Sequence, residues 1–292
     1  MKLVIGKTAG FCFGVKNAVG KVEEEINKRE KIYCLGELVH NKQVTEKLTQ
    51  KGISFIDNVE EAENNVVFRT HGVTKQTYEL AEKLNLEIMD LTCPKVLYIH
   101  KLAQEYANKD YFIILTGEIK HPETIGTISF CGKDYIVIED EKEINSAIKA
   151  FGKSNKEKLA VISQTTFKLE KFNDIVEKIK EKVETKKLEV NNTICNATRE
   201  RQQETEEIAQ MVDLMIIIGG KHSSNSKKLY ELSTKYCSRV LFIETEKDFD
   251  STQINKNSTI GIMAGASTPE ESISRVVSMI FENVPKIFKH KP

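Results

Sequence analysis

Three similar stretches organise the chain: TAGFC at residues 8–12, LTC at 91–93 and TIC at 193–195. Each stretch follows a short apolar run that predicts a strand, and each ends in a cysteine that leads into a helical pattern. Each predicted helix is followed by another apolar strand that ends in glycine. Because the three blocks are in register, the sequence predicts an internal threefold repeat.

Polar residues occupy matching positions in the three blocks. The position 28 residues after each cysteine holds His40, His121 and Ser223, and the position two residues further on holds Lys42, Glu123 and Asn225. The last strand of each block runs into a third polar set: His71, Thr165 and Ser267. The offset of this set from the cysteine is 72 residues in the second and third blocks and 59 in the first.

The alternation of strands and helices in each block favours a small α/β unit with a largely parallel sheet. We expect a first unit at 1–92 with an N-terminal cysteine loop, a second at 93–194, and a third with the C-terminal tail at 195–292. Ligands of open parallel sheets bind beyond the carboxyl ends of the strands. Three such units arranged as a pseudo-threefold trefoil would bring the three thiols and the polar residues to one central site.

The composition excludes several classes of protein. The 292 residues contain 43 Lys plus Arg and 43 Asp plus Glu, so no net charge favours a nucleic acid or an anionic membrane surface. With 40% apolar and 29% charged residues the chain is typical of a globular protein, and its apolar runs are far shorter than the roughly 20 residues that span a bilayer. The N-terminal residues lack the pattern of a signal peptide, and we expect a cytoplasmic location.

Cys12, Cys93 and Cys195 are candidate metal ligands because helix N-termini favour the thiolate form. Soft thiolates select iron–sulfur clusters, zinc or copper(I). Three thiolates would satisfy three corners of a four-iron cube and leave one iron open for a substrate. The sequence contains no C-x-x-C pair, so any metal site must be assembled from distant parts of the chain. The other three cysteines are interpreted as buried thiols: Cys34, Cys131 and Cys237.

The polar residues near the predicted strand ends are suited to bind an anion. Histidine, serine and asparagine side chains can donate hydrogen bonds, and this set comprises His40, His71, His121, Ser223, Ser224, Asn225 and Ser267. The turn at Gly219-Gly220 lies between a predicted strand and a predicted helix, which would direct backbone N–H groups toward a phosphate. Glu123 is the only carboxylate at a repeat-equivalent position, and beside a cluster and an anion it could stay protonated and act as a general acid.

The motifs of the chain resemble those of the 4-hydroxy-3-methylbut-2-enyl diphosphate reductases from Lys2 to about Phe281. The matching motifs are FCFGV (11–15), LVHN (38–41), RTHG (69–72), TCP (92–94), HPE (121–123), SQTT (163–166), CNAT (195–198) and SSNS (223–226). The resemblance implies that the three candidate cysteines hold a four-iron, four-sulfur cluster with one iron not bound by cysteine. It also implies that Glu123 is the proton donor, that Thr165 contacts the substrate hydroxyl, and that the anion-binding set holds the diphosphate.

The reaction implied by this resemblance is the last step of the non-mevalonate isoprenoid pathway. An allylic diphosphate would be reductively dehydroxylated to isopentenyl and dimethylallyl diphosphates, with electrons from a ferredoxin or a flavodoxin. Two alternatives remain at this point: a quinolinate-synthase-like iron–sulfur dehydratase and a non-enzymatic iron–sulfur sensor. The donor-rich set disfavours the dehydratase, because dicarboxylates usually require arginine forks, and a sensor has no use for Glu123 and Thr165.

Overall fold

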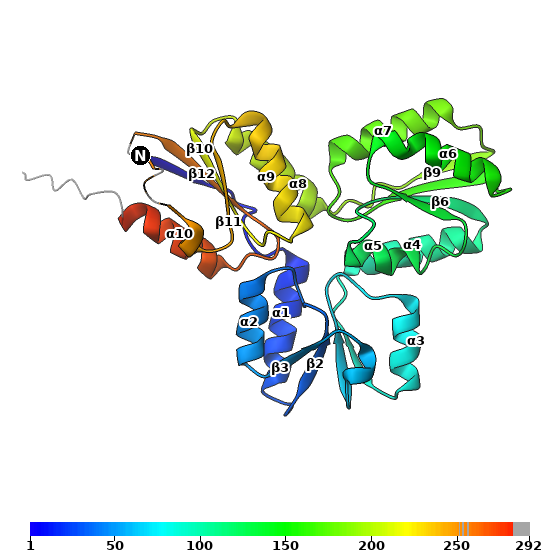
Figure 1. Ribbon diagram of the computed structural model, residues 1–292, viewed down its shortest axis with the longest axis horizontal. Helices are drawn as coiled ribbons and strands as arrows, with labels where there is room; N and C mark the ends of the chain where they lie inside the picture. The colour runs from blue at the N-terminus through cyan, green and yellow to red at the C-terminus, as the bar shows by residue number, and fades with distance from the viewer. Residues whose placement is uncertain (251, 253, 256, 283–292) are drawn as a thin grey trace, which may run out of the picture. The chain divides into compact units, whose positions relative to one another are not determined.

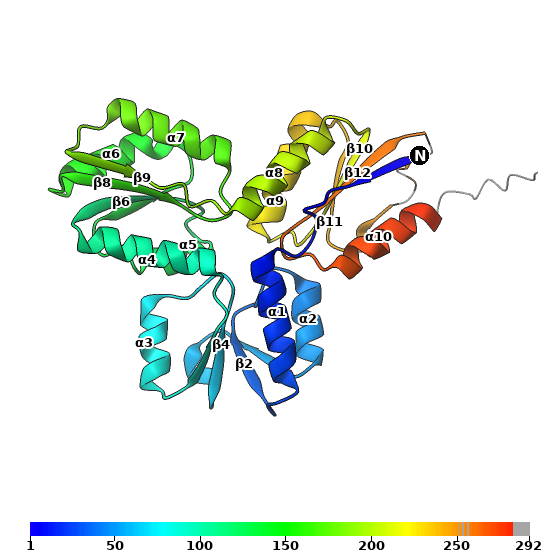
Figure 2. The same cartoon turned by 180° about the vertical axis from the view of Figure 1, so that it is seen from behind.

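The computed structural model describes residues 1–250, 252, 254–255 and 257–282. Within these residues the strands form three four-stranded sheets, here named A, B and C, and all of the strand pairs are parallel (Figures 1 and 2). This arrangement confirms the prediction of three α/β units with parallel sheets. No helix of the described part of the chain has both the length and the apolar composition to cross a membrane.

The chain divides into two compact bodies. The sheet A body comprises Met1–Cys12, His40–Lys42 and the residues from Glu200 onward, and the sheet B/C body comprises Phe13–Val39 and Gln43–Arg199. Each body has its own buried apolar clusters.

Sheet A has the strand order β1-β12-β10-β11. Its strands are β1 (Lys2–Ile5), β10 (Leu214–Ile218), β11 (Val240–Ile243) and β12 (Thr259–Ala264). Helix α10 (Glu270–Glu282) covers one face of the sheet through Ile273, Val276 and Ile280. Helices α8 (Asn196–Ala209) and α9 (Ser224–Tyr236) cover the other face (Figure 1), where Ile208 and Leu229 pack against the strands.

Sheet B has the strand order β3-β2-β4-β5. Its strands are β2 (Ile32–Leu35), β3 (Ile53–Ile56), β4 (Asn65–Phe68) and β5 (Glu87–Asp90). Helices α1 (Phe13–Ile26) and α2 (Lys42–Gln50) lie on one side of this sheet and α3 (Lys75–Lys83) lies on the other (Figure 2). The apolar cluster beneath α3 contains Phe68, Val66 and Ala81, which are all fully buried.

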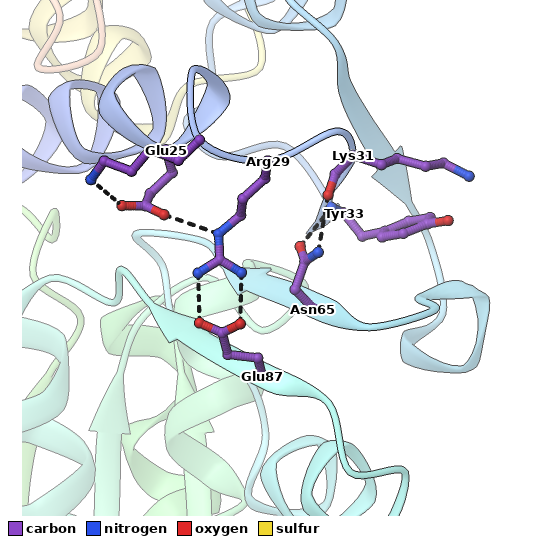
Figure 3. A network of polar contacts seen from close by, with 7 residues as sticks. Glu25, Arg29, Lys31, Tyr33, Asn65 and Glu87 are labelled. Carbon is purple, nitrogen blue, oxygen red and sulfur yellow. Dashed lines mark hydrogen bonds and ion pairs between the residues drawn. The ribbon is translucent and has the colours of Figure 1, made fainter.

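Polar contacts at the surface of sheet B connect the end of α1 to the edge strand β5 (Figure 3). The guanidinium of Arg29 donates from Nη1 and Nη2 to the two carboxylate oxygens of Glu87 at 2.7 and 2.6 Å, and from Nε to Glu25 at 2.9 Å. The side chain of Asn65 donates to the carbonyl of Lys31 at 3.0 Å. Ion pairs near the protein surface contribute little to the free energy of unfolding.

Sheet C has the strand order β7-β6-β8-β9. Its strands are β6 (Tyr111–Thr116), β7 (Tyr135–Ile138), β8 (Lys158–Ser163) and β9 (Lys187–Val190). Helices α4 (Pro94–Asn108) and α5 (Pro122–Ile128) cover one face, and α6 (Ile144–Lys153) and α7 (Leu169–Lys182) cover the other. With helices on both faces, the central strands β6 and β8 are buried and apolar over most of their length, as expected for a parallel sheet.

The strand before each cysteine belongs to the sheet of the preceding block. Strand β5 pairs with β4 in sheet B, and β9 pairs with β8 in sheet C. Strand β1 takes the same place beside β12 in sheet A, whereas the predicted unit at 1–92 includes this strand. The first strand of the chain therefore belongs to sheet A. The domain boundaries near residues 92 and 194 stay a prediction.

Candidate functional site

The loops after β2, β6 and β10 share one backbone hydrogen bond. In each loop the glycine that follows the strand donates its N–H to the last residue of the neighbouring strand: Gly36 to Ile56, Gly117 to Ile138 and Gly219 to Ile243. Four residues after these glycines come His40, His121 and Ser223. The structure thus confirms that these three polar residues occupy equivalent positions at the carboxyl ends of the strands.

The loops after β4, β8 and β12 correct the third predicted equivalence. Each loop closes with an N–H to carbonyl bond across three residues: Gly72 to Arg69, Phe167 to Gln164 and Thr268 to Gly265. This register aligns His71 with Thr166 and Ser267, and it places Thr165 one position earlier. The last strand of the second block ends one residue further from its cysteine than the last strand of the third block does. Equal offsets of 72 residues from the cysteines therefore do not mark equivalent positions.

The backbone of each candidate metal ligand is held by the same kind of loop. The cysteine N–H donates to a carbonyl two residues after the end of a strand: Cys12 to Ala266 at 3.1 Å, Cys93 to Thr70 at 3.0 Å and Cys195 to Thr165 at 3.0 Å. Each of these cysteines directly precedes a helix, namely α1, α4 or α8. The positive end of a helix dipole stabilises a thiolate at this position.

The six cysteines fall into two groups by burial. Cys12, Cys93 and Cys195 are partly exposed, whereas Cys34, Cys131 and Cys237 are buried. Burial raises the pKa of Cys34 and of Cys131 to about 12. All three buried thiols also donate to backbone carbonyls, as from Cys131 to Thr127 at 3.4 Å. The thiols of Cys34 and Cys131 therefore stay protonated. The three partly exposed cysteines are the better candidates for the soft sulfur ligands that an iron–sulfur cluster requires.

Gly14 lies close to the thiol of Cys93. A Cβ atom on Gly14 would lie 2.9 Å from Cys93 Sγ, so a side chain at this position would collide with the thiol. Gly14 follows Cys12 by two residues in the sequence.

In the part of the chain that the structure describes, no group of three His, Cys, Asp or Glu side chains is placed to hold a metal ion.

A buried carboxyl group and a hydroxyl lie together in the sheet B/C body. Glu123, in the first turn of α5, is 2% exposed. Its Oε1 accepts the N–H of Thr165 at 2.6 Å, and its Oε2 accepts the Thr165 hydroxyl at 2.6 Å. Because the Thr165 carbonyl also accepts the N–H of Cys195, one threonine connects the carboxyl group to a candidate metal ligand.

Two histidines flank this carboxyl group. His121 is the N-cap of α5, and its Nδ1 accepts the N–H of Glu123 at 3.1 Å. A neutral ring that accepts at Nδ1 carries its hydrogen on Nε2, so this nitrogen is a hydrogen-bond donor. The ring of His71 meets that of His121 edge to face, with 5.6 Å between centroids. The structure therefore brings Glu123, Thr165, His71 and His121 together.

A second group of predicted residues lies in the sheet A body. Ser223 is the N-cap of α9 and accepts the N–H of Ser226. Ser267 donates to the carbonyl of His40 at 3.0 Å. The same carbonyl lies 2.9 Å from the position of a Cβ on Gly220, so glycine is required in that turn. His40, Ser223 and Ser267 thus surround one turn at the N-terminus of α9.

Asn225 has a polar side chain that the described residues leave unsatisfied. It is 4% exposed, and neither Oδ1 nor Nδ2 has a hydrogen-bond partner within the described part of the chain. A buried polar group without a partner costs about 1–3 kcal/mol. An amide held at that cost in the first turn of a helix is suited to bind a polar ligand.

The family model described as LytB protein matches residues 3–281. The chain belongs to the LytB family. A relative from Clostridioides difficile (strain 630), named 4-hydroxy-3-methylbut-2-enyl diphosphate reductase, is 39% identical over 286 residues, covering 96% of this chain and 99% of the relative. A relative of the same name from Aquifex aeolicus (strain VF5) is 37% identical and covers 96% of each chain.

Two solved structures of similar proteins agree with this LytB assignment. One is described as (E)-4-hydroxy-3-methyl-but-2-enyl diphosphate reductase, the terminal enzyme of the non-mevalonate pathway. It has a TM-score of 0.70 at 37% identity and covers 97% of this chain and 100% of that one. The other, E-1-hydroxy-2-methyl-but-2-enyl-4-diphosphate reductase from Plasmodium falciparum, has a TM-score of 0.87 at 32% identity and covers 95% and 87%.

The LytB chain also contains a clamp on its first cysteine loop, formed by side chains that no sequence pattern predicted. Arg201 of α8 donates to the carbonyls of Thr8 and Gly10, at 2.5 to 2.9 Å. Glu204 accepts the N–H groups of Lys7 and Thr8 at 2.6 and 2.8 Å, and the Thr8 hydroxyl at 2.6 Å. Burial favours a higher pKa for Glu204, but these hydrogen bonds outweigh it and lower the pKa. The residues that lead to Cys12 are thus fixed by two charged side chains of one helix.

Proposed function

We propose that this LytB chain is a 4-hydroxy-3-methylbut-2-enyl diphosphate reductase, the last enzyme of the non-mevalonate pathway. Its substrate would be (E)-4-hydroxy-3-methylbut-2-enyl diphosphate, and its products isopentenyl diphosphate and dimethylallyl diphosphate. The structural observation that carries the proposal is the buried Glu123–Thr165 pair, which is hydrogen-bonded to the loop of Cys195. The names of relatives that are 37 to 39% identical over nearly the whole chain support the substrate assignment.

The proposed cofactor is a four-iron, four-sulfur cluster with one iron not bound by cysteine. Its ligands would be Cys12, Cys93 and Cys195, because only these thiols combine partial exposure with a position at a helix N-terminus. When bound, such a cluster would supply electrons and a Lewis acid for cleavage of the allylic C–O bond. The clamp formed by Arg201 and Glu204 would hold the backbone of the Cys12 loop in place.

Glu123 and Thr165 are proposed to deliver the proton that lets the hydroxyl leave as water. With Glu123 protonated, its Oε2 would donate to Thr165 Oγ1, and the Thr165 hydrogen would point toward the substrate hydroxyl. Overall, the substrate takes up two electrons and two protons, loses water, and gives either product. The 2.6 Å separation between the two oxygens suits such a transfer because donor and acceptor are already within hydrogen-bond distance.

The diphosphate is proposed to bind neutral hydrogen-bond donors among the predicted residues. His121 can donate from Nε2, and the unsatisfied amide of Asn225 can donate from Nδ2. The remaining proposed contacts are His40, His71, Ser223, Ser224 and Ser267. Anchoring of the diphosphate would allow binding energy from the unreactive end of the substrate to orient its hydroxymethyl group.

The proposal extends to the electron donor and the compartment. A ferredoxin or a flavodoxin would deliver the electrons, since the sequence lacks a nicotinamide or flavin fingerprint. We expect the enzyme to act in the cytoplasm, without a nucleic-acid or membrane partner.

The test is anaerobic incubation of the purified protein with the diphosphate substrate and a strong one-electron reductant. The reductase proposal predicts isopentenyl and dimethylallyl diphosphates, identified by mass spectrometry. A quinolinate-synthase-like dehydratase would yield no reduced product, and a sensor would leave the diphosphate unchanged. Either of those outcomes, in protein with a full complement of iron and sulfide, would overturn the proposal.

A further inference from the structure

A cavity of about 190 Å³ lies at the carboxyl ends of the strands of sheet B, against α5. Its walls include Gly36 after β2, Arg69 after β4, Thr74 and Thr77 at the start of α3, and Pro122 of α5. All of these residues belong to the sheet B/C body. The volume is below the roughly 300–1,000 Å³ of pockets for drug-sized ligands, so the cavity suits a small molecule or ion.

Arg69 brings a positive charge to this cavity without a partner for it among the described residues. The residue is partly buried, and its Nε atom is shielded from water and makes no hydrogen bond within the described part of the chain. Burial lowers the pKa of Arg69, and no hydrogen bond of its guanidinium opposes this effect. The Nη1 atom lies only 2.1 Å from the position of a Cβ on Gly36, so glycine leaves room for the guanidinium. A charge removed from water is costly unless it is paired, and a guanidinium fork matches the oxygens of a carboxylate or a phosphate.

Two threonine hydroxyls in the same wall leave one hydrogen for a ligand. Thr74 Oγ1 and Thr77 Oγ1 are 2.8 Å apart, so one hydroxyl donates to the other. The two hydroxyls carry two hydrogens, and this contact uses one of them. The Thr74 oxygen also accepts the N–H of Thr77 at 3.2 Å. Since the described residues offer no acceptor for the second hydrogen, the pair can donate it to a ligand in the cavity.

Asp57 adds an acceptor to the cavity. The residue is exposed, so water reduces the effect of its negative charge on an anion nearby. Its carboxylate can accept a hydrogen bond from a ligand hydroxyl. Inorganic phosphate carries such a hydroxyl at neutral pH, whereas acetate does not. An arginine fork, a hydroxyl donor and a carboxylate acceptor therefore favour phosphate over a simple carboxylate.

We propose that this cavity is a binding site for a small oxyanion of the phosphate type. Arg69 pairs with the charge of the anion, and the hydroxyls of Thr74 and Thr77 donate to one of its oxygens. The inference goes beyond the proposed reductase activity and does not depend on it.

The cavity is distinct from the candidate site but adjoins it in the sequence. None of the residues proposed to hold the cluster, the substrate or the transferred proton lines it. Two of its wall residues are direct neighbours of such residues. Gly72 follows His71. Pro122 lies between His121 and Glu123.

The experiment measures binding of inorganic phosphate to the anaerobic holoenzyme by isothermal calorimetry, with acetate as a second probe. Arg69→Met should weaken phosphate binding by about 10- to 100-fold, the range for loss of hydrogen bonds to a charged group. Arg69→Lys keeps the charge without the planar fork, so it should weaken binding less. Acetate should bind the wild type at least about tenfold more weakly than phosphate does, because it lacks the hydroxyl.

Lys75→Met is the matched control for net charge. Lys75 directly follows Thr74, but it is exposed and does not line the cavity. Its replacement removes one positive charge, as Arg69→Met does, and should leave phosphate affinity at the wild-type value. Asn225→Ala separates the cavity from the proposed diphosphate site, and binding in the cavity should persist in this variant.

Thermal unfolding provides a second readout. Replacement of a buried charge by an apolar side chain is often neutral or stabilising, so Arg69→Met should stay folded. Phosphate should raise the unfolding temperature of the wild type and of Lys75→Met, but not that of Arg69→Met. Absence of phosphate binding to the wild type, or wild-type affinity in Arg69→Met, would overturn the inference. Equal weakening in Lys75→Met, loss of binding in Asn225→Ala, or equal affinity for acetate would overturn it as well. Product formation by the wild-type enzyme reports on the proposed function independently of these affinities.

Discussion

Replacement of Glu123 by glutamine should separate proton delivery from electron delivery. The carboxyl group accepts two hydrogen bonds from Thr165, one from the N–H and one from the hydroxyl, both at 2.6 Å. In Glu123→Gln the amide oxygen can still accept the N–H, and the NH₂ group can donate to the hydroxyl oxygen. The variant therefore keeps two hydrogen bonds and loses only the ability to release a proton.

The magnitudes of the two effects differ enough to be distinguished. Exchange of charge-assisted for neutral hydrogen bonds should change the free energy of unfolding by no more than about 2 kcal/mol. Loss of a general acid should lower the turnover rate by roughly 10²- to 10⁴-fold, which corresponds to about 3–5 kcal/mol in the activation barrier. Cluster content and substrate affinity should stay close to those of the wild type.

The assay is single-turnover product formation by pre-reduced enzyme, so that electron supply does not limit the rate. Thr165→Ser is the matched control because it keeps the hydroxyl, and it should keep most of the activity. Thr165→Val removes the hydroxyl that is proposed to pass the proton from Glu123 to the substrate, and it should be as slow as Glu123→Gln. Near-normal turnover in Glu123→Gln would refute the role of Glu123 as the essential proton donor.

Three further predictions concern the cluster and the diphosphate. Replacement of Cys12, Cys93 or Cys195 by serine should remove most of the iron, because a hydroxyl is a poor ligand for this metal. The same replacement at each of the three buried cysteines should leave the iron content near the wild-type level. Equal iron loss at all six positions would contradict the ligand assignment. A substrate analogue that lacks one phosphate should bind at least about tenfold more weakly in calorimetry, because charge-assisted hydrogen bonds are lost, and equal affinity would argue against the diphosphate site. In Glu204→Gln one amide oxygen replaces the two carboxylate oxygens that accept three hydrogen bonds from the Cys12 loop. A chelator should therefore remove iron from this variant faster than from the control Glu207→Gln, which changes an exposed residue of the same helix. Identical rates of iron release would show that the clamp does not hold the Cys12 loop.

Local sequence patterns predicted the sheets well, but they could not assign every strand to its neighbour. The apolar runs of β6 and β8 and the glycines that follow the strands are local signals, and the structure confirms them. The partner of β1 is β12, more than two hundred residues away, and nothing in the residues of β1 specifies that pairing. Parallel neighbours are selected by packing over the whole chain, which a short apolar run does not encode.

The sequence predicted candidate site residues where the repeat marks equivalent positions. It did not predict contacts between residues that lie far apart in the sequence. The counts from each cysteine found His40, His121 and Ser223, but they placed Thr165 one position away from its structural equivalent. The hydrogen bonds from Thr8 to Glu204 join residues 196 positions apart, and no periodicity marks them. Side chains that hold a loop from a distant helix become visible only once the chain is folded.

The most direct test of the central claim is the electron count of the reaction. The anaerobically purified holoenzyme is titrated with a reductant of known concentration in the presence of excess diphosphate substrate, and the products are quantified by mass spectrometry. The reductase assignment predicts one molecule of isopentenyl or dimethylallyl diphosphate for every two electrons consumed. Consumption of substrate without consumption of electrons, or oxidation of the reductant without either product, would contradict it.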